Sequence, residues 1–592
     1  MQAPGVIFLT FTFCGSRIQW RPVTRFRNLI EALEAAPGDR PFVMAWIDED
    51  EQDAVTFAEF RHRATAHAAI LRSCGLSVGD RVVIIMPQGV TAMTAFVGAM
   101  MLGAVPAFLA GPNFKVEPSK YRAGLAGVTA NLGAKLVVID DEFPDEMLEH
   151  IALGEDAKLI RLSAAASECD SISEGGCWPS SQIEPGSLAF IQHSAGTTGL
   201  QKGVALTHAA VLRQIEHLAQ ALKIEDASDR VYSWLPLYHD MGLIACFMLP
   251  MACHLPVVMQ SPLDWVMHPE TMLQIIGEHK CTLAWLPNFA FQFVPRRVPR
   301  NRWMQYDLSS ARALINCSEP VRSSSMDEFR KAFAEAGLKS SAVQSSYAMA
   351  ENVFAVAQSP VGQTAGSTQV HADGQQFRSF HRIVRVPEKS PGAIVFASSG
   401  KLLPNHKVRI VSESGETTSP DQVGEILVQS DCLFDGYFNR PDLTAAVLLD
   451  GWYHTGDLGF FLDDELYVVG RKKDLLIIGG ENIYPQDIEE IVARHATIHD
   501  GRAIAMGLYN PDLGTEDVVV VAEVGRAADL GNSNEIEREI RAQVVAGMGV
   551  AVRTIFLKPP KWIVKSTAGK AARAATREKL LREHPELDTE PV

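Results

Sequence analysis

The sequence predicts an α/β fold with a smaller α+β part at its C-terminus. Over the first 350 residues, short apolar runs typical of buried strands alternate with amphipathic stretches typical of helices. Beyond residue 471, strands and helices follow one another over a stretch of the size of a small domain. Because alternating strands and helices form parallel sheets with crossover helices, we expect ligands at the carboxyl ends of the strands.

The expected elements of the long N-terminal part are apolar runs followed by helical patterns. Residues 81–86 predict a strand and residues 91–102 the helix after it. A second pair is the strand at 187–191 and the helix at 207–222. Further strands are expected at residues 135–139, 231–235, 256–259, 283–286, 313–316 and 342–346. The polar motifs of this part all fall at the ends of such strands.

Beyond residue 358 the pattern changes. Residues 359–401 are rich in Gly, Ser, Thr, Gln and Pro, so we expect a loop-rich insertion or a small inserted element. Short strands at 407–411 and 424–429 predict a small β-subdomain. A boundary near residue 471 separates residues 1–470 from a compact unit at 475–592. That unit is expected to contain strands at 475–478, 502–507, 517–524 and 553–557 and helices at 485–494 and 533–545.

Composition narrows the class of protein. At 592 residues the chain is too long for one core, and 47% hydrophobic with 21% charged residues is typical of globular proteins. The net charge of −16 argues against a nucleic-acid partner, because phosphate backbones require basic patches. Nine dispersed cysteines without a CxxC pair are typical of a reduced cytoplasmic protein. No apolar run reaches the roughly 18 residues of a membrane span, and the run at 6–14 is too short, and lacks the preceding positive charge, for a typical signal peptide.

The most informative segment is rich in Gly and Thr and follows an expected strand. Its small residues allow Thr197, Thr198 and Gly199 to surround a phosphate chain, and Lys202 adds a positive charge. The Walker pattern does not fit, because Gly203 follows the lysine where that pattern needs Ser or Thr. Taken alone, the segment could also be a solvated turn.

Further polar motifs follow other strands or lie in turns. Residues 233–243 contain His239, in a setting that fits either a ligand pocket or a buried core histidine. Tyr347 offers a ring that can stack on a purine, and Glu351 offers a carboxylate that can bind Mg²⁺, although a strand-end turn with a capping Glu is the alternative. Asp457 lies in a Gly-containing turn, where it can accept both hydroxyls of a ribose or simply form the turn.

In their order along the chain, these motifs resemble those of the adenylate-forming superfamily of acyl-CoA synthetases, fatty acyl-AMP ligases and luciferases. The resemblance extends from about residue 26 to residue 580, and residues 233–243 are most similar to fatty acyl-AMP ligases. It implies a large N-terminal domain of two doubly wound sheets plus a small β-subdomain. A small mobile α+β domain would follow and rotate about a hinge at residues 471–474, at Lys473.

The resemblance also implies the roles of residues at matching positions. The expected nucleotide-binding residues are Thr197, Thr198, Gly199, Lys202, Ser318, Glu319, Ser346, Tyr347, Ala348, Asp457, Arg471 and Lys570. The expected acyl pocket is formed by Trp234, His239, Met241 and Gly242. Mg²⁺ is expected at Thr198 and Glu351, and the expected catalytic residues are Lys570, Thr198, His239 and Glu351. In this family the lysine at the position of Lys570 contacts the carboxylate and the α-phosphate, where it stabilises the charge that develops.

The chain departs from the family pattern at three positions. Ala195 stands where Ser or Thr is usual, and Gln201 where Pro is usual, which puts the rigidity of the phosphate loop in question. Ala348 stands where Gly is usual, which implies a slightly different backbone path beside Tyr347.

The expected reaction is the activation of a fatty acid by ATP in the cytoplasm. The carboxylate attacks the α-phosphorus of Mg·ATP, pyrophosphate leaves, and rotation about Lys473 presents the adenylate to a thiol. Two acceptors remain open: CoA and the phosphopantetheine of a carrier protein acting in trans. The insertion and residues 484–489 are similar to fatty acyl-AMP ligases, whereas residues 480–485 are similar to acyl-CoA synthetases. A non-catalytic acyl- or nucleotide-binding protein is the remaining alternative, and the presence of Lys570 and Glu351 argues against it.

Overall fold

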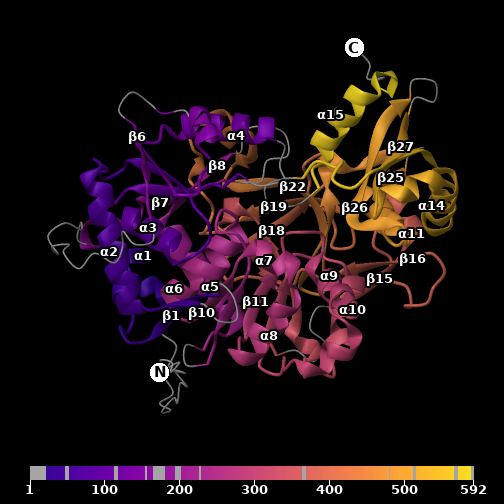
Figure 1. The fold of residues 1–592 in the computed structure, drawn as a ribbon. Helices are drawn as coiled ribbons and strands as arrows, with labels where there is room; N and C mark the ends of the chain where they lie inside the picture. Colours follow the sequence, from indigo (N-terminus) through magenta and orange to yellow (C-terminus); the bar gives the residue numbers. More distant parts are fainter. Residues whose placement is uncertain are drawn as a thin grey trace, which may run out of the picture.

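The computed structural model describes residues 22–46, 52–112, 118–151, 153, 157–163, 180–193, 202–225, 228–362, 368–478, 481–510, 515–565 and 571–587 (Figure 1). The C-terminal strands and helices lie at one side of a large body formed by the rest of the chain (Figure 1). Among the described residues, no helix combines the length and the apolar character that crossing a membrane requires.

The largest sheet has nine strands. In spatial order these are β17 (Lys401–Leu402), β14 (Ala355–Gln358), β13 (Val343–Ala348), β12 (Ala313–Asn316), β11 (Leu283–Leu286), β9 (Val231–Ser233), β10 (Val257–Gln260), β1 (Pro41–Trp46) and β2 (Gln52–Thr56). The strands from β13 to β1 run parallel, and β14, β17 and β2 pair antiparallel at the two edges. Every residue of β9, β10, β11 and β12 is buried, as expected for parallel strands covered by helices on both faces.

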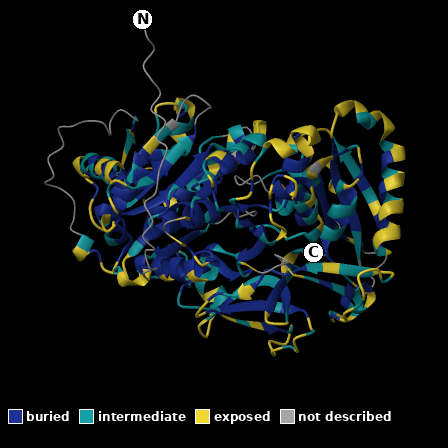
Figure 2. Cartoon of the chain, turned by 90° about the horizontal axis from the view of Figure 1, so that it is seen from below, coloured by how far each residue is buried: buried dark blue, intermediate teal, exposed yellow. Residues whose placement is uncertain are grey.

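A second parallel sheet has four strands, in the order β4 (Val105–Phe108), β3 (Arg81–Ile85), β5 (Leu136–Ile139) and β6 (Lys158–Arg161). Helices α2 (Phe57–Ser73) and α3 (Val90–Met101) cross at Gly98, where a Cβ atom would lie 2.7 Å from the Ala64 carbonyl oxygen. The other helices of the large part are α1 (Leu29–Glu34), α4 (Pro118–Leu132), α5 (His208–Leu222), α6 (Leu249–Cys253), α7 (Pro262–Met267), α8 (Glu270–Glu278), α9 (Ala290–Arg297) and α10 (Ser323–Phe333). Buried residues fill the space between sheets and helices (Figure 2), and the expected α/β class is confirmed.

The chain before α5 differs from the expectation. β7 (Leu188–His193) pairs antiparallel with β8 (Gly203–Thr207), and β20 (Gly436–Tyr437) extends this small sheet beyond β8. The expected phosphate loop therefore connects two antiparallel strands and does not lead directly from a strand into a helix. β8 escaped detection because it runs without a break into the helical pattern, where the Thr207 hydroxyl caps α5 by accepting from the Ala210 N–H.

An antiparallel sheet forms the β-subdomain. It contains β18 (Lys407–Val411), β19 (Gly424–Gln429), β22 (Trp452–Leu462) and β21 (Leu448–Leu449), with β23 (Glu465–Arg471) paired to β22. β18 and β19 confirm the strands expected at 407–411 and 424–429. The short helix α12 (Pro441–Val447) precedes β21.

The insertion contains an ordered element in addition to its loops. β15 (Gln369–Asp373) pairs with β16 (Ala393–Ala397), and α11 (Gly374–Phe380) begins where the Asp373 side chain accepts two backbone N–H groups. Elements this short give no periodic signal, so composition alone predicts loops here. Phe377 of α11 stacks on Tyr484 with ring centroids 5.2 Å apart, so the insertion contacts the C-terminal part of the chain.

The C-terminal part has its own sheet. β24 (Leu476–Ile478) and β25 (Glu481–Ile483) form a pair, and β26 (Ile498–Asn510), β27 (Thr515–Val524) and β28 (Val552–Lys558) form a three-stranded sheet. Its helices are α13 (Pro485–Ala493), α14 (Ser533–Met548) and α15 (Arg573–Glu583). Alternate residues of β27 face opposite sides: Val520 packs with α13 and α14, whereas Val521 packs with α15. The strands and helices expected here are confirmed, and β25 was not expected.

Candidate active site

Several expected site residues lie where parallel strands of the nine-stranded sheet end. Trp234 follows β9, Ser318 follows β12, and Tyr347 and Glu351 lie at the end of β13. Because β9, β11, β12 and β13 are successive parallel neighbours, their carboxyl ends share one edge of the sheet. The sheet thereby brings together residues that are far apart in the chain.

Asp457 is held at this edge by two partners. The pairing of β22 with β23 sets Asp457 opposite Arg471, whose Nε lies 3.3 Å from Asp457 Oδ1. The Tyr347 hydroxyl donates to Asp457 Oδ2 over 2.6 Å. Burial raises the pKa of Asp457, and Arg471 and the Tyr347 hydroxyl act in the opposite direction. A carboxylate held in this way can accept ribose hydroxyls, while the adjacent ring can stack on a base.

Glu351 and Lys202 both contact Tyr437. The Tyr437 hydroxyl donates to Glu351 Oε1 over 2.6 Å, and Lys202 Nζ lies 4.6 Å from the centre of the Tyr437 ring. This contact follows from the pairing of β20 with β8, which sets Tyr437 opposite Val204. Sequence reasoning missed Tyr437, because a lone tyrosine in a two-residue strand carries no motif.

The two groups of residues influence one another electrostatically. The charge of Asp457, with smaller contributions from Asp474 and Glu351, raises the pKa of Arg471. Partial burial and the positive charges of Arg471 and Lys202 lower the pKa of Lys473. Charged groups from several separate segments therefore lie close together, as a site for a charged nucleotide requires.

The carboxylate of Glu351 fits the chemistry of a magnesium ligand. Carboxylate oxygens are the ligands that Mg²⁺ prefers in proteins. Glu351 is half-buried, and within the part of the chain that the structure describes it makes no ion pair. Thr198, the other expected ligand, lies outside the described residues.

The residues expected to form the acyl pocket lie among aromatic and apolar groups. Trp234 stacks on Trp265 with ring centroids 3.8 Å apart. His239 Nδ1 lies 2.7 Å from Asp240 Oδ1, just before a π-helical segment at Met241–Met248. Only glycine fits at Gly242, because a Cβ atom there would lie 2.2 Å from the Pro236 carbonyl oxygen. π-Helical turns often occur at functional sites.

Two of the expected adenine-side residues, Ser318 and Glu319, contact this region. The Ser318 hydroxyl donates to the sulfur of Met241 over 3.7 Å, and Ser318 has a positive φ of 68°. Glu319 Oε2 accepts the Phe289 N–H over 3.0 Å. The hydroxyl of Ser346 donates to the Ala357 carbonyl oxygen inside the sheet, so this side chain is engaged within the fold. Ala348 ends β13.

Four expected residues cannot be placed. Thr197, Thr198, Gly199 and Lys570 lie outside the described residues, as does the Gly479–Gly480 pair. The chain on either side of Lys570 is described: Lys565 and Ala571 form an antiparallel bridge. Two residues further on, Arg573 Nη1 lies 2.8 Å from Asp474 Oδ2 and Nη2 lies 2.6 Å from Glu489 Oε1. These ion pairs bring the start of α15 to the expected hinge.

Arg322 joins the large part to the C-terminal part through ion pairs. Arg322, just before α10, places Nη1 3.0 Å from Asp487 Oδ1 and 3.1 Å from Glu490 Oε2. Both carboxylates belong to α13, and the Ser324 hydroxyl donates to Glu490 over 3.2 Å. The orientation of the C-terminal part is thus stabilised by charged side chains from both sides of the boundary.

Comparisons with known proteins agree with this geometry. Residues 30–438 match the family model described as AMP-binding enzyme. The long-chain-fatty-acid–AMP ligase FadD32 of Mycolicibacterium smegmatis is 31% identical over 89% of this chain and 89% of its own length. A putative acyl-CoA synthetase of Caulobacter vibrioides is 28% identical over 93% of this chain and 95% of its own length.

A solved structure shows the same architecture. It comes from structural and functional studies of fatty acyl-adenylate ligases from E. coli and L. pneumophila, and it aligns with a TM-score of 0.86 and 28% identity over 95% of this chain and 99% of that chain. The match extends over both the sheets of the large part and the C-terminal sheet. The expected resemblance is confirmed, and the chain belongs to the AMP-binding family of adenylate-forming enzymes.

Proposed function

We propose that this enzyme activates a fatty acid with ATP and transfers the acyl group to the phosphopantetheine thiol of a carrier protein that acts in trans. The observation that supports the proposal most directly is the contact of Tyr347, Asp457 and Arg471 beside Glu351. The relatives described as fatty-acid–AMP ligases support the substrate class.

In the proposed complex, the adenine stacks on Tyr347 and borders Ser318, Glu319, Ser346 and Ala348. Asp457 accepts the ribose hydroxyls, and Arg471 makes a second contact to the ribose or a phosphate. Thr197, Thr198, Gly199 and Lys202 surround the phosphates. Thr198 and Glu351 hold Mg²⁺, which neutralises phosphate charge when it is bound.

The proposed chemistry is an in-line displacement. A carboxylate oxygen of the fatty acid forms a bond to the α-phosphorus, and the bond from that phosphorus to the oxygen bridging toward the β-phosphorus breaks. Pyrophosphate leaves with the electron pair, and no covalent enzyme intermediate forms. Lys570 contacts the carboxylate and the α-phosphate, where its charge offsets the charge that develops. Trp234, His239, Met241 and Gly242 line the acyl pocket.

We place the hinge for the second half-reaction at residues 471–474, with Lys473 as its pivot. Residues 1–470 would stay fixed while residues 475–592 rotate and exchange Lys570 for the Gly479–Gly480 segment at the adenylate. Fatty acyl-AMP ligases carry a similar insertion, and the packing of Phe377 on Tyr484 attaches this insertion to the C-terminal part, which supports a carrier protein as the acceptor. The Caulobacter relative and residues 480–485 favour CoA as the alternative acceptor.

Mass spectrometry after incubation with ATP, a fatty-acid panel and either CoA or a pantetheinylated carrier protein tests both half-reactions. We expect acyl-adenylate and acylated carrier protein. Acyl-CoA formed as fast as adenylate would contradict the choice of acceptor. The absence of fatty-acid-dependent pyrophosphate exchange would contradict the activity itself.

The role of Lys570 is tested by Lys570→Ala, with the exposed Lys339→Ala as the matched control. We expect the first variant to bind ATP but to lose about a thousandfold or more in adenylate formation, since one positive charge at the transferring phosphate contributes that order of stabilisation. Lys339→Ala should behave as the wild type. Adenylate formation within a few-fold of the wild type in Lys570→Ala would show that the role is wrong.

A further inference from the structure

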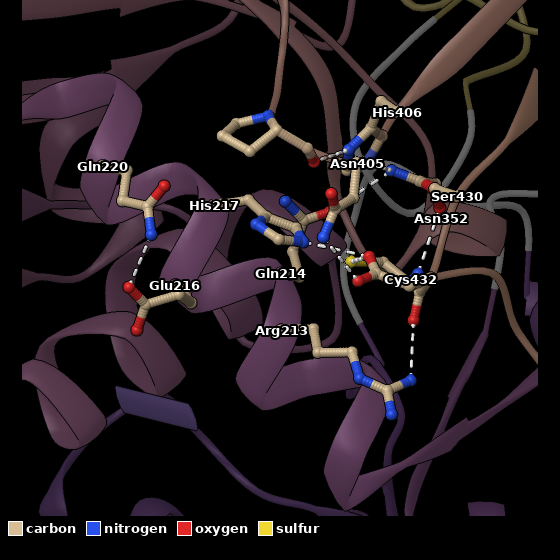
Figure 3. Close-up of polar contacts among 12 residues, drawn as sticks. Arg213, Gln214, Glu216, His217, Gln220, Asn352, Asn405, His406, Ser430 and Cys432 are labelled. Carbon is tan, nitrogen blue, oxygen red and sulfur yellow. Dashed lines mark hydrogen bonds and ion pairs between the residues drawn. The ribbon is translucent and has the colours of Figure 1, made fainter. Parts of the chain in front are cut away.

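A network of polar side chains surrounds the residue that follows Glu351 in the chain. It joins α5, the turn at residues 350–354, the loop before β18 and the chain after β19 (Figure 3). None of its members belongs to an expected motif. The side chain at its centre is Asn352, which directly follows Glu351 and has an exposed fraction of 0%.

The amide of Asn352 contacts every one of these segments. Its Nδ2 group lies 2.8 Å from the Ala355 carbonyl oxygen, 3.3 Å from Gln214 Oε1 and 2.9 Å from His406 Nε2. Its Oδ1 atom accepts the Ser430 hydroxyl over 2.5 Å. Figure 3 shows these side chains converging on Asn352 from separate elements. A buried amide whose two ends are both hydrogen-bonded rigidifies its surroundings.

The proton positions of His406 follow from its partners. His406 Nδ1 lies 2.8 Å from the Pro404 carbonyl oxygen, which can only accept, so the proton is on Nδ1 and Nε2 accepts from Asn352. Burial lowers the pKa of His406 to about 4, so the ring is neutral near pH 7. In this protonation state both ring nitrogens of His406 have a partner.

The backbone after Asn352 is strained. Val353 has φ of 62° and ψ of −53°, and the Phe354 N–H donates to the Asn352 carbonyl oxygen over 2.6 Å. This is a γ-turn with a positive φ at a β-branched residue, a rare and strained conformation that persists only where the surroundings enforce it. The two N–H groups of Asn352 are taken up by the shorter contacts, to Ala355 and His406, and together with the bond from Ser430 they constrain this turn.

The same network also holds the other support of Glu351. Asp431, next to Ser430, accepts from Asn405 Nδ2 over 3.1 Å and lies 2.9 Å from His217 Nε2. The chain then runs to Phe434, whose N–H donates to the Glu351 carbonyl oxygen over 2.9 Å, and on to Tyr437. Glu351 is thus fixed through its own backbone by Phe434 and through its carboxylate by Tyr437.

We infer that Asn352 is a positioning residue: with the strained turn at Val353 and the anchored chain from Ser430 to Tyr437, it sets the direction in which the Glu351 carboxylate meets Mg²⁺ bound to the triphosphate. The inference rests on the proposed role of Glu351. Outer partners that orient a metal ligand typically contribute a factor of about 10 to 100 to metal affinity.

A metal ion at the edge of the network is a different explanation for part of it. Donor atoms of His217, Asp431 and Cys432 lie within 4.8 Å of one another. They already satisfy one another, because Asp431 Oδ1 lies 2.9 Å from His217 Nε2 and accepts the Cys432 thiol over 3.3 Å. The Arg213 guanidinium also donates to the Asp431 carbonyl oxygen, which places a positive charge beside the cluster. The contacts are therefore those of a hydrogen-bond network.

The test compares Asn352→Ala with Asn28→Ala. Asn28 is equally buried and also makes hydrogen bonds at both ends of its amide, but it lies in the N-cap of α1 outside the network. We expect Asn352→Ala to raise the Mg²⁺ concentration for half-maximal pyrophosphate exchange about tenfold, with kcat at saturating Mg²⁺ within about threefold of the wild type. Asn28→Ala should lower the melting temperature without changing the Mg²⁺ dependence.

A binding measurement accompanies the kinetics. Mn²⁺ in place of Mg²⁺, titrated into enzyme with ATP but without fatty acid and followed by electron paramagnetic resonance, reports metal affinity without turnover. We expect the affinity to fall in Asn352→Ala by the same factor. Should Asn352→Ala not fold, Ser430→Ala removes one bond to Asn352 Oδ1, and we expect a shift of about threefold in the same direction.

Two results would overturn the inference: an unchanged metal dependence in folded Asn352→Ala and Ser430→Ala, or an equal shift in Asn28→Ala. These results differ from a failure of the proposed function. In that case the wild type itself would show no fatty-acid-dependent pyrophosphate exchange, and the inference would be wrong as well. Glu351→Gln tests whether Glu351 itself binds the metal ion. If that change leaves metal affinity intact, the role of Glu351 is wrong.

Discussion

Asp457 both forms a turn and contacts two distant side chains, and the sequence indicates only the turn directly. As a turn residue it needs nothing beyond its local chain, but the structure also gives it Tyr347 and Arg471 as partners. The hydroxyl and the guanidinium hold both carboxylate oxygens in place before any ligand arrives. Preorganised groups of this kind contribute more to binding than mobile ones, because less side-chain freedom is lost.

Asp457→Asn should weaken ATP binding. The change removes the negative charge that strengthens hydrogen bonds to the ribose and that pairs with Arg471, so kcat/KM for ATP should fall about 10- to 100-fold. Pyrophosphate exchange at varied ATP measures this. Tyr347→Phe keeps the ring and should cost less than Asp457→Asn. Equal activity of Asp457→Asn and the wild type would contradict the assigned contact.

At the scale of elements, the insertion is attached to the C-terminal part through α11. Phe377 is buried between Phe396 of β16 and Tyr484, whereas Phe380 of the same short helix is 63% exposed. An element of so few residues has little stability of its own, so its position depends on packing against neighbours such as Tyr484. Through this ring, the insertion can restrain the rotation of the C-terminal part.

Phe377→Ala should loosen that attachment and raise the yield of acyl-CoA relative to acyl-adenylate. Removing a buried phenyl ring leaves a cavity and costs about 3 kcal/mol or more of packing, which frees the C-terminal part to rotate. The product ratio in the presence of CoA is the measurement, with Phe380→Ala as the matched control. An identical ratio in both variants would show that the insertion does not restrain transfer to CoA.

At the scale of the whole molecule, Arg322 connects the two parts. Its guanidinium contacts Asp487 and Glu490 at once, and 23% of its side chain is exposed. Partly buried pairs that share one cation are worth more than isolated surface pairs. The orientation of the C-terminal part should therefore depend on this residue.

Arg322→Gln should increase the rate of proteolytic cleavage at residues 471–474, since the parts separate more often when the charge pair is lost. Arg63→Gln is the matched control, because Arg63 pairs with Asp53 within the large part at a similar exposure of 24%. Limited proteolysis followed by mass spectrometry gives both rates. Equal cleavage rates in the two variants would mean that contacts other than those of Arg322 hold the C-terminal part in its orientation.

Stability should fall on mild acidification because of buried neutral histidines. His67 on α2 is 0% exposed, and burial lowers its pKa to about 4 from the ordinary 6.5. Below pH 6.5 this histidine is protonated in the unfolded chain but stays neutral in the folded chain. The free energy of unfolding therefore decreases as pH falls toward 4, by up to about 3 kcal/mol. Above pH 6.5 the ring is neutral in both states, so this histidine does not lower the free energy of unfolding there.

His67→Leu should therefore flatten the dependence of the melting temperature on pH between 7 and 5. His62→Leu, an exposed position on the same helix, should follow the wild type. Thermal melts followed by circular dichroism at several pH values provide the comparison. A wild-type slope in His67→Leu would mean that this ring does not carry the effect.

The sequence by itself determined the types of the elements, the strand-end positions of the motifs and the family, because hydrophobic periodicity and short motifs are local properties of the chain. The placement of Asp457 opposite Arg471 also follows from local hairpin pairing of β22 with β23. Single-sequence patterns were enough for these features, although the strand β8 was hidden by the helix that follows it.

Only the tertiary structure decided which distant residues touch. Tyr437 meets Glu351 and Lys202, Asn352 meets His406 and Ser430, and the insertion reaches Tyr484. Each of these contacts joins segments that lie far apart in the chain and depends on sheet pairing. A single Tyr, Asn or Phe forms no sequence pattern from which its partner could be predicted. Its role becomes visible only in the folded structure, where packing sets the orientation of its side chain.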